Sequence, residues 1–433
     1  MRSATWQLLL GCLLGLLPLA CVDPEELLLR GTVDIIVVEG TITNRAEPQL
    51  IRINRSKADP LTGRFGTTPM TKAKVEVVVD SAQIIPCHET QAGSYQLPAD
   101  FKGQIGHAYQ LRFVLPDGSH YQSNQQIMLS VPPIQRIYAQ FNPESLAPGE
   151  AIGGSYRAAH DFFLDAQDPA GQSNYYRWEW TLWEKQDWCR SCAMGVYSIN
   201  TVLSRYSANG APIFVAGDSL LEDCFYPPAT TIGLERYFVY DYSCRSQCWA
   251  VIHSHQLNVF ADTYTNGSLL TGRKVAQIPY YQHASCLVEI RQTALNPQAY
   301  QYFKQFEEQT QKTGSLADSP PAALGGNIHN RADAQEGVVG YFTASAVSST
   351  RYWLDRTDAT KLPLGASDPA GASGLPGAEL FYALNGRQPN PEPSPPNTPT
   401  VQILYKSLTT RPFTAICESN ENQTPVKPEG WRD

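Results

Sequence analysis

Ten cysteines are the most reactive side chains in this sequence. Cys12 lies in an apolar amino-terminal segment and Cys21 directly follows that segment, which leaves eight cysteines in the body of the chain. An even number is typical of an exported protein held by disulfides, here up to four. Sequence alone does not choose among the roughly one hundred pairings that eight cysteines allow. The candidate disulfide cysteines are Cys87, Cys189, Cys192, Cys224, Cys244, Cys248, Cys286 and Cys417.

A structural zinc site is the alternative use of two close cysteine pairs. Cys189 and Cys192 form a CxxC pair, and Cys244 and Cys248 form a second pair further along the chain. The long separation between the pairs is unusual for a zinc module, and exported thiolates tend to oxidise. Disulfides are therefore the favoured interpretation.

Familiar catalytic motifs are missing from the sequence, which has no HExxH, P-loop, GxGxxG or GxSxG pattern. His253 and His255 would lie on one face of a strand, with His283 as a conceivable third metal ligand. Such alternation is common on exposed strands, however, and no carboxylate pair can be assigned as a glycosidase requires. We predict that the protein is not an enzyme and has no metal and no cofactor.

Aromatic side chains are concentrated between residues 175 and 188. Alternation along a strand would place some of them on one face and some on the other. Such faces can stack on sugar rings or bind a partner protein, although packing into the core is the more ordinary use of these residues. The candidate ligand or partner aromatics are Tyr176, Trp178, Trp180, Trp183 and Trp188.

The amino-terminal residues 1–20 have the form of a signal peptide. Arg2 precedes an apolar run that begins at Trp6, and the small residue Ala20 ends the segment. The run is too short and too poorly flanked for a membrane span. We therefore predict that this segment is removed on export.

Residues 17–21 resemble a bacterial lipobox, with Pro18 where Leu is usual. We predict that Cys21 is lipidated and that residues 21–32 form a lipid-anchored linker. The alternative is an ordinary secreted protein that is cut at the same place.

Composition limits the classes of function. The 433 residues carry a net charge of -8, and this acidic balance makes nucleic-acid binding an unfavourable interpretation. Only 17% of the residues are charged, whereas Tyr numbers 22 and Pro 32. This composition favours a mainly β fold with many turns.

Two folded regions are expected. Residues 33–131 contain short β-branched and alternating runs, such as 34–43 and 74–79, which predict an immunoglobulin- or transthyretin-like β-sandwich. Two prolines at 132–133 mark its end. Residues 134–433 predict a larger β-rich domain, with one helix at about 297–312 and with long Pro-rich loops at 363–377 and 385–400.

Several segments together resemble the domain-of-unknown-function family 4249, whose members are lipoproteins of Bacteroidota. The resemblance is carried by Cys21 with its acidic followers and by residues 36–43, 70–75, 93–95, 174–178, 300–303, 320–328 and 337–345. It implies an outer-membrane location facing the cell exterior and a TonB-dependent outer-membrane barrel as partner. The family has no established activity, so it implies no catalytic residues.

The function expected from these observations is that of a non-enzymatic surface lipoprotein. It would be the accessory partner of a TonB-dependent transporter and help to capture or admit an unidentified ligand. Two alternatives stay open, which are a structural or assembly subunit of an envelope or secretion complex and a surface hydrolase. A deep pocket would favour ligand capture, a flat apolar surface would favour assembly, and convergent carboxylates or a Ser/His pair would indicate a hydrolase.

Overall fold

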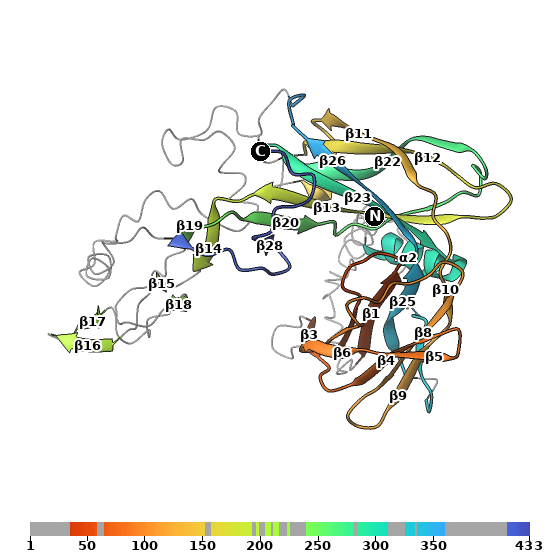
Figure 1. Cartoon of the computed structure of the whole chain (residues 1–433), viewed down its shortest axis with the longest axis horizontal. Coiled ribbons are helices and arrows are strands. Elements are labelled where there is room, and N and C mark those ends of the chain that lie inside the picture. The colour runs from red at the N-terminus through yellow and green to blue at the C-terminus, as the bar shows by residue number, and fades with distance from the viewer. Residues whose placement is uncertain are drawn as a thin grey trace, which may run out of the picture.

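The computed structural model is mainly β, which confirms the predicted fold class (Figure 1). Among the described residues α2 (Pro297–Thr310) is the one α-helix, and it begins at the predicted proline. Asn296 caps it, because its Oδ1 accepts the amide hydrogen of Ala299 at 2.8 Å. None of the helices in this part of the chain is long and apolar enough to cross a membrane.

The structure describes residues 35–58, 65–151, 157–192, 196–198, 204–208, 211–215, 223–225, 240–280, 284–310, 325–333, 336–359 and 414–433. The predicted signal peptide, the linker with Cys21 and both Pro-rich loops lie outside these residues.

The first unit consists of two six-stranded sheets around one core. The first sheet has the order β25 (Val338–Ser345), β1 (Ile36–Thr43), β2 (Leu50–Ala58), β7 (Ser94–Gln96) and β6 (His88–Gln91), and β3 (Phe65–Pro69) pairs with β2. The second has the order β24 (Ile328–Asn330), β9 (His120–Ser123), β8 (Ala108–Val114), β4 (Lys74–Val79) and β5 (Gln83–Pro86), and β10 (Gln126–Ile127) pairs with β8. Alternate residues of both sheets, such as Val38, Val77 and Phe113, are buried in the shared core. The likeness to an immunoglobulin or transthyretin sandwich stays a prediction.

The first unit is completed by strands from late in the chain. β25 pairs in parallel with β1 over its whole length, from Ile36 opposite Val338 to Thr43 opposite Ser345. β24 and β25 fall within residues 134–433, the region assigned from sequence to the second domain. Pairing between parallel strands that are far apart in sequence leaves no local sequence pattern. A boundary drawn at residues 132–133 therefore leaves β24 and β25 out of the first unit.

The second unit packs a three-stranded sheet against a six-stranded sheet. The smaller sheet has the order β11 (Ile134–Asn142), β12 (Ala159–Gln167) and β22 (Leu269–Pro279). The larger has the order β26 (Val347–Leu354), β23 (Cys286–Leu295), β13 (Tyr175–Lys185), β20 (Trp249–His253) and β28 (Gln423–Thr424), with β21 (Asn258–Ala261) also on β13. Phe162, Leu164, Leu182 and Val288 are among the side chains that fill the core between them.

Further along the second unit, smaller sheets extend away from the two units (Figure 1). They comprise β14 (Trp188–Cys192), β19 (Tyr240–Cys244) and β27 (Thr414–Ala415); β15 (Val196–Ser198) and β18 (Asp223–Phe225); and β16 (Ser204–Ala208) and β17 (Ala211–Val215). The single 3-10 helix in the described ranges is η1 (Pro148–Glu150). The carboxyl-terminal segment returns to the large sheet, where Trp431 packs on Trp249 and Trp353 with ring centroids 5.9 and 5.1 Å apart.

Candidate functional site

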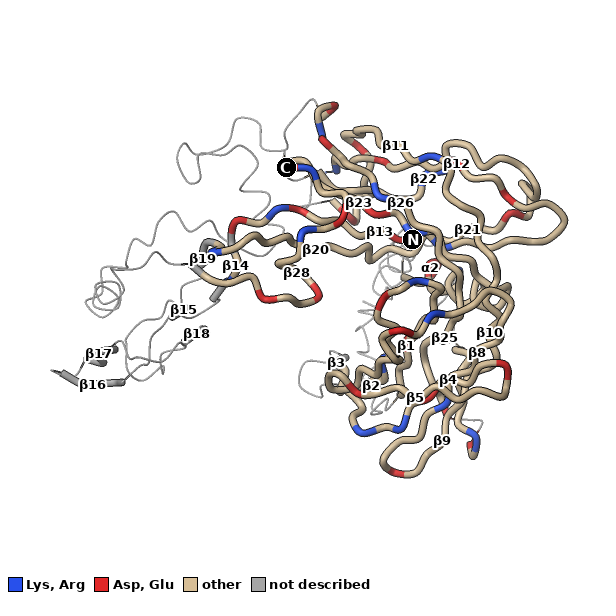
Figure 2. The backbone as a smooth tube through the Cα atoms, in the orientation of Figure 1, with Lys and Arg blue, Asp and Glu red and all other residues tan. Residues whose placement is uncertain are grey.

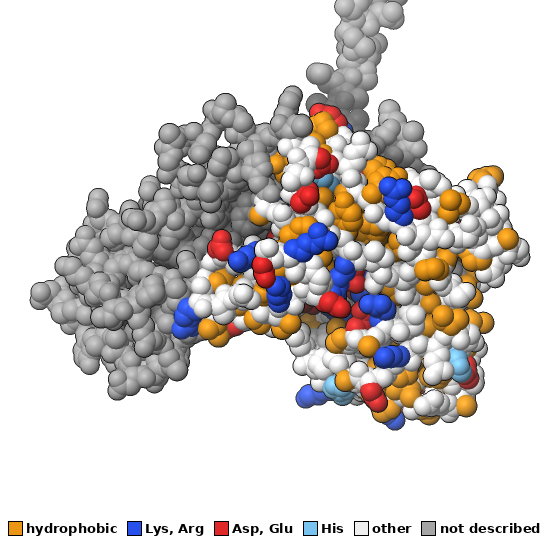
Figure 3. All heavy atoms as spheres, turned by 45° about the horizontal axis from the view of Figure 1, so that its top comes forward, with side chains coloured by type: hydrophobic (Ala, Val, Ile, Leu, Met, Phe, Trp, Pro, Cys, Tyr) orange, Lys and Arg blue, Asp and Glu red, His pale blue; other side chains and the backbone are white. Residues whose placement is uncertain are grey.

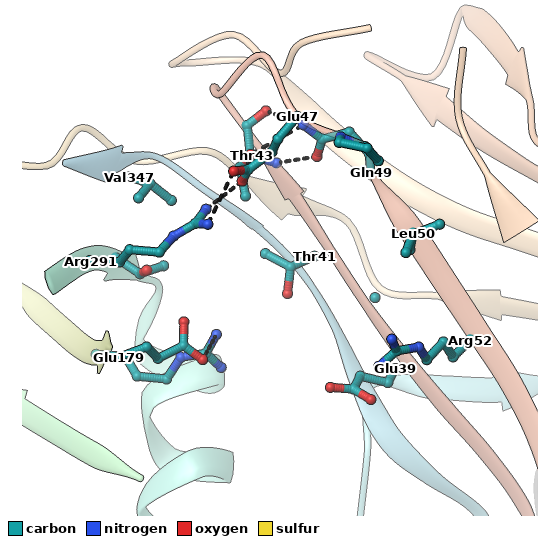
Figure 4. A pocket seen from close by; sticks show the side chains of 14 residues that line it. Glu39, Thr41, Thr43, Glu47, Gln49, Leu50, Arg52, Glu179, Arg291 and Val347 are labelled. Atoms are coloured by element: carbon teal, nitrogen blue, oxygen red, sulfur yellow. Dashed lines mark hydrogen bonds and ion pairs between the residues drawn. The ribbon is translucent and has the colours of Figure 1, made fainter. Parts of the chain in front are cut away.

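A polar pocket of about 280 Å³ lies where the two units meet (Figure 4). β1, β2 and the loop between them line one side, and β13 and β23 line the other. Its lining combines carboxylates, guanidinium groups and threonine hydroxyls. The charged members are Glu39, Glu47, Arg52, Arg177, Glu179 and Arg291.

Arg291 and Glu47 form an ion pair across the pocket. Arg291 Nη1 lies 3.1 Å from Glu47 Oε2, and Nη2 donates to Glu47 Oε1, so the contact is bidentate. Burial alone would lower the pKa of Arg291, but the hydrogen bonds and charge of Glu47 raise it above its ordinary value. Because Glu47 belongs to the first unit and Arg291 to the second, this pair joins the units.

Two other arginines of the lining are also paired. Arg177 Nη2 lies 3.0 Å from Glu179 Oε1, and its guanidinium lies 4.6 Å from the ring centre of Phe303 on α2. Arg52 Nη2 lies 2.6 Å from Oε1 of Glu421, which is in the carboxyl-terminal segment. Charges of opposite sign therefore lie close together around the pocket, and one face of the molecule shows such mixing between small apolar patches (Figure 3).

Glu39 is the exception among the charged groups of the lining. It is exposed on β1, directly across the ladder from Arg52, whose guanidinium contacts Glu421 instead. No ion pair or hydrogen bond to the Glu39 carboxylate is found within the described part of the chain. The pocket therefore contains one negative charge that is available to a ligand.

The rim of the pocket is held rigidly by a buried amide. Gln49 Oε1 accepts the amide hydrogen of Thr43 at 2.8 Å, and Gln49 Nε2 donates to Thr43 Oγ1 at 3.1 Å. Asn44 Oδ1 accepts the amide hydrogen of Val347 at 2.8 Å and fixes the same loop to β26. A preformed site of this kind costs a ligand little ordering on binding.

The chemistry that these groups offer is recognition of a small polar ligand. The described lining supplies no His, Cys, Ser, Lys or Tyr, and two of its three carboxylates are already bound to arginines. A cationic or hydrogen-bond-donating part of a ligand would face Glu39. Sequence analysis missed this pocket because its charged residues come from segments that are distant in sequence and carry no motif.

Three of the four aromatic candidates whose side chains the structure describes pack in or against the core of the second unit. Tyr176 and Trp178 are each 1% exposed and pack in the core of the second unit, and Trp180 is half-buried against the same core. Trp183, on the opposite face, is half-buried beneath the guanidinium of Arg351, 5.4 Å from its ring centre. The prediction of a ligand role for Tyr176 and Trp178 is therefore wrong, because alternation identifies a shared face but not whether another sheet covers it. The side chain of Trp188 lies outside the described residues.

Among the candidate cysteines whose side chains the structure describes, four form two disulfides. These are Cys189–Cys244 and Cys248–Cys417, and the second joins the carboxyl-terminal segment to the large sheet. The sulfurs of Cys189, Cys248 and Cys417 lie within 4.8 Å of one another, so the two disulfides are neighbours.

The other candidate cysteines differ from the prediction. Cys87 and Cys286 are free thiols, so their assignment to disulfides is wrong. Each lies within a different unit, and burial, their largest influence, raises the pKa of each thiol to about 12. The side chains of Cys192 and Cys224 are outside the described residues.

Comparison with known proteins adds one finding. Residues 22–351 match the family described as Domain of unknown function (DUF4249), which covers most of the chain. The chain belongs to the DUF4249 family. The match ends at residue 351 within β26 and so contains every residue that lines the pocket. Glu421, which pairs with Arg52 and is not part of the lining, lies beyond it. No curated protein matches this DUF4249 chain.

Proposed function

We propose that this DUF4249 protein is a lipid-anchored, non-enzymatic ligand-capture protein on the outer face of the outer membrane, where it partners a TonB-dependent transporter. The lipobox-like segment at residues 17–21 and the acidic residues after Cys21 support the location. The observation that carries ligand capture is the polar pocket between the units, in which the Glu39 carboxylate has no hydrogen-bond or ion-pair partner among the described residues.

The pocket favours capture over the assembly alternative. A structural subunit would be expected to offer a flat apolar surface, whereas this site is concave, charged and held by a buried hydrogen-bond network. The ligand would be small and polar, and its cationic or donor group would be recognised by Glu39. It would pass from this pocket to the transporter.

The partnership is tested by affinity purification from outer membranes of the native organism in mild detergent. A TonB-dependent barrel recovered near one to one with the full chain is the expected result. Recovery with a large envelope complex and without such a barrel would favour the assembly alternative. Cys21→Ala is the matched control, and it should leave the folded protein without membrane attachment.

Ligand capture is tested separately with purified protein. A screen of small cationic and zwitterionic compounds by thermal shift should yield a stabilising ligand, and Glu39→Gln should abolish that shift. Asp100→Asn is the control for removal of one exposed carboxylate that does not line the pocket. A hit that binds equally well to the Glu39→Gln protein would exclude this pocket as the capture site.

A further inference from the structure

A second polar surface lies on the outer face of the sheet that contains β4, β8 and β9. Register places Lys74 opposite Val114, Val114 opposite His120, and the Arg331 amide 2.8 Å from the His120 carbonyl. These four residues therefore form one row that crosses β4, β8, β9 and the residue directly after β24. Their neighbours along the strands, such as Phe113 and Tyr121, are buried in the core, so the row itself faces outwards.

The next row on the same face continues this pattern. Glu76 lies opposite Arg112, Arg112 opposite Gln122, and Gln122 opposite His329. Together the rows border a groove of about 210 Å³ whose lining includes Lys74, Arg112 and Arg331. In Figure 2, Lys and Arg positions occur close to the β4, β8 and β9 labels.

The cationic groups of this groove are available to a ligand. Lys74 and Arg331 are exposed, and Arg112 donates through Nε to Gln110 Oε1 at 2.9 Å. Within the described ranges none of the three lies within ion-pair distance of a carboxylate, in contrast to the paired arginines of the first pocket. Glu76 is the only acid among the described residues of the lining, so these residues have a formal charge of +2 with histidine neutral.

This concentration of positive charge is unusual for a chain whose net charge is -8. We propose that the groove is an oxyanion site that binds a phosphate group. A phosphate monoester carries close to two negative charges at neutral pH, and its three terminal oxygens accept hydrogen bonds from several directions. Lys74 on β4, Arg112 on β8 and Arg331 after β24 come from different directions, so they can each donate to a different phosphate oxygen. The site is separate from the pocket between the units and does not depend on the proposed transporter.

The test is titration of the full mature chain with inorganic phosphate by calorimetry at low salt. Saturable binding is expected, and it should weaken at least tenfold in the Arg112→Gln/Arg331→Gln protein. Binding should also weaken as salt screens the charges. The Lys102→Gln/Arg136→Gln protein is the matched control, since it loses the same charge from exposed positions outside the groove, and it should bind as the unmodified chain does.

The source of the phosphate is distinguished by vesicles of phosphatidylcholine with and without phosphatidate. Binding of both inorganic phosphate and phosphatidate vesicles would assign the groove to a lipid headgroup, and binding of phosphate alone would assign it to a soluble ligand. If the double variant does not fold, phosphate binding is measured with Arg331→Gln alone, because this position is exposed and its substitution should not disturb the fold. Binding by this variant should also be weaker. Absence of phosphate binding, or equal binding by the groove and control variants, would overturn the proposal.

Discussion

Arg291 and Glu47 show how two side chains can position a site and join two halves of a molecule. Both are only partly exposed, at 24% and 31% of their side-chain surface, so solvent screens their attraction less than at an open surface. Arg291→Met should reduce the free energy of unfolding by about 1–3 kcal/mol, because Glu47 then loses its partner in a partly buried site. Urea denaturation measures this loss.

A double-mutant cycle isolates the contribution of the pair itself. Arg291→Met combined with Glu47→Gln should show a coupling of about 0.5–3 kcal/mol. Arg136→Gln is the control for loss of one arginine, since Arg136 is exposed and does not line the pocket. Purely additive effects of the two pocket variants would contradict the assignment of this ion pair as the joint between the units.

His160 predicts a dependence of stability on pH. Its side chain is fully buried, Nε2 lies 2.9 Å from Asp358 Oδ1, and Nδ1 has no hydrogen-bond partner in the described structure. Burial lowers the pKa of His160 and outweighs the opposing effect of Asp358. The unfolded chain therefore binds a proton more readily than the folded protein does.

The sign of the effect follows from this difference. The stabilisation is present above the unfolded pKa of about 6.5 and is lost as the pH falls through that value, by at most about 1.4 kcal/mol per pH unit. Urea denaturation between about pH 7.5 and 5.5 should show a weaker pH dependence for His160→Gln than for the unmodified chain. An unchanged slope in the variant would show that other groups cause the dependence.

At the scale of elements, the contact between β1 and β25 requires a glycine at position 340. Its φ is +108°, and a Cβ at this position would lie 1.9 Å from the Val38 carbonyl oxygen. Gly340→Ala should therefore destabilise the protein by about 3 kcal/mol or more. Gly337→Ala is the control, because a Cβ there meets open space, and it should change stability by less than about 0.5 kcal/mol. Equal midpoints of the two variants in urea would contradict the close approach of these strands.

Elements with a local pattern could be predicted from the sequence. The β-branched run at 34–43 and the alternating run at 74–79 form β1 and β4, and Asn296 and Pro297 mark the start of α2. The pairing of β1 with β25 could not be predicted, since it depends on two strands whose sequences carry no mutual signal. Alternation predicts that the aromatic run in β13 is a strand, but which face is buried depends on the smaller sheet that packs on it.

At the scale of the whole molecule, the Cys248–Cys417 disulfide closes a loop of 169 residues and holds the carboxyl-terminal segment on the large sheet. Cys248→Ser/Cys417→Ser should lower the free energy of unfolding by about 2–4 kcal/mol. Cys87→Ser, which removes a half-buried free thiol, is the control for loss of a cysteine without loss of a bond. Peptide mapping without reduction should recover Cys189 with Cys244 and Cys248 with Cys417, and any other partners for these cysteines would contradict the structure.

The candidate pocket also depends on the arrangement of the whole molecule, because its lining comes from both units. Glu39 and Glu47 lie near the start of the chain, whereas Arg177 and Arg291 lie far along it. Nothing in the sequence around any of them indicates a site, and they come together where the two units pack against each other. The cysteine pairings could not be predicted for the same reason, although their number indicated that disulfides were present.

The parallel strand β25 has a consequence for the order in which the protein can be made. Residues 35–127 are synthesised and exported well before residues 338–345, and until β25 arrives β1 has an unpaired edge and the core lacks Phe342. The nascent amino-terminal third is therefore an incomplete sheet that can pair with a neighbouring chain.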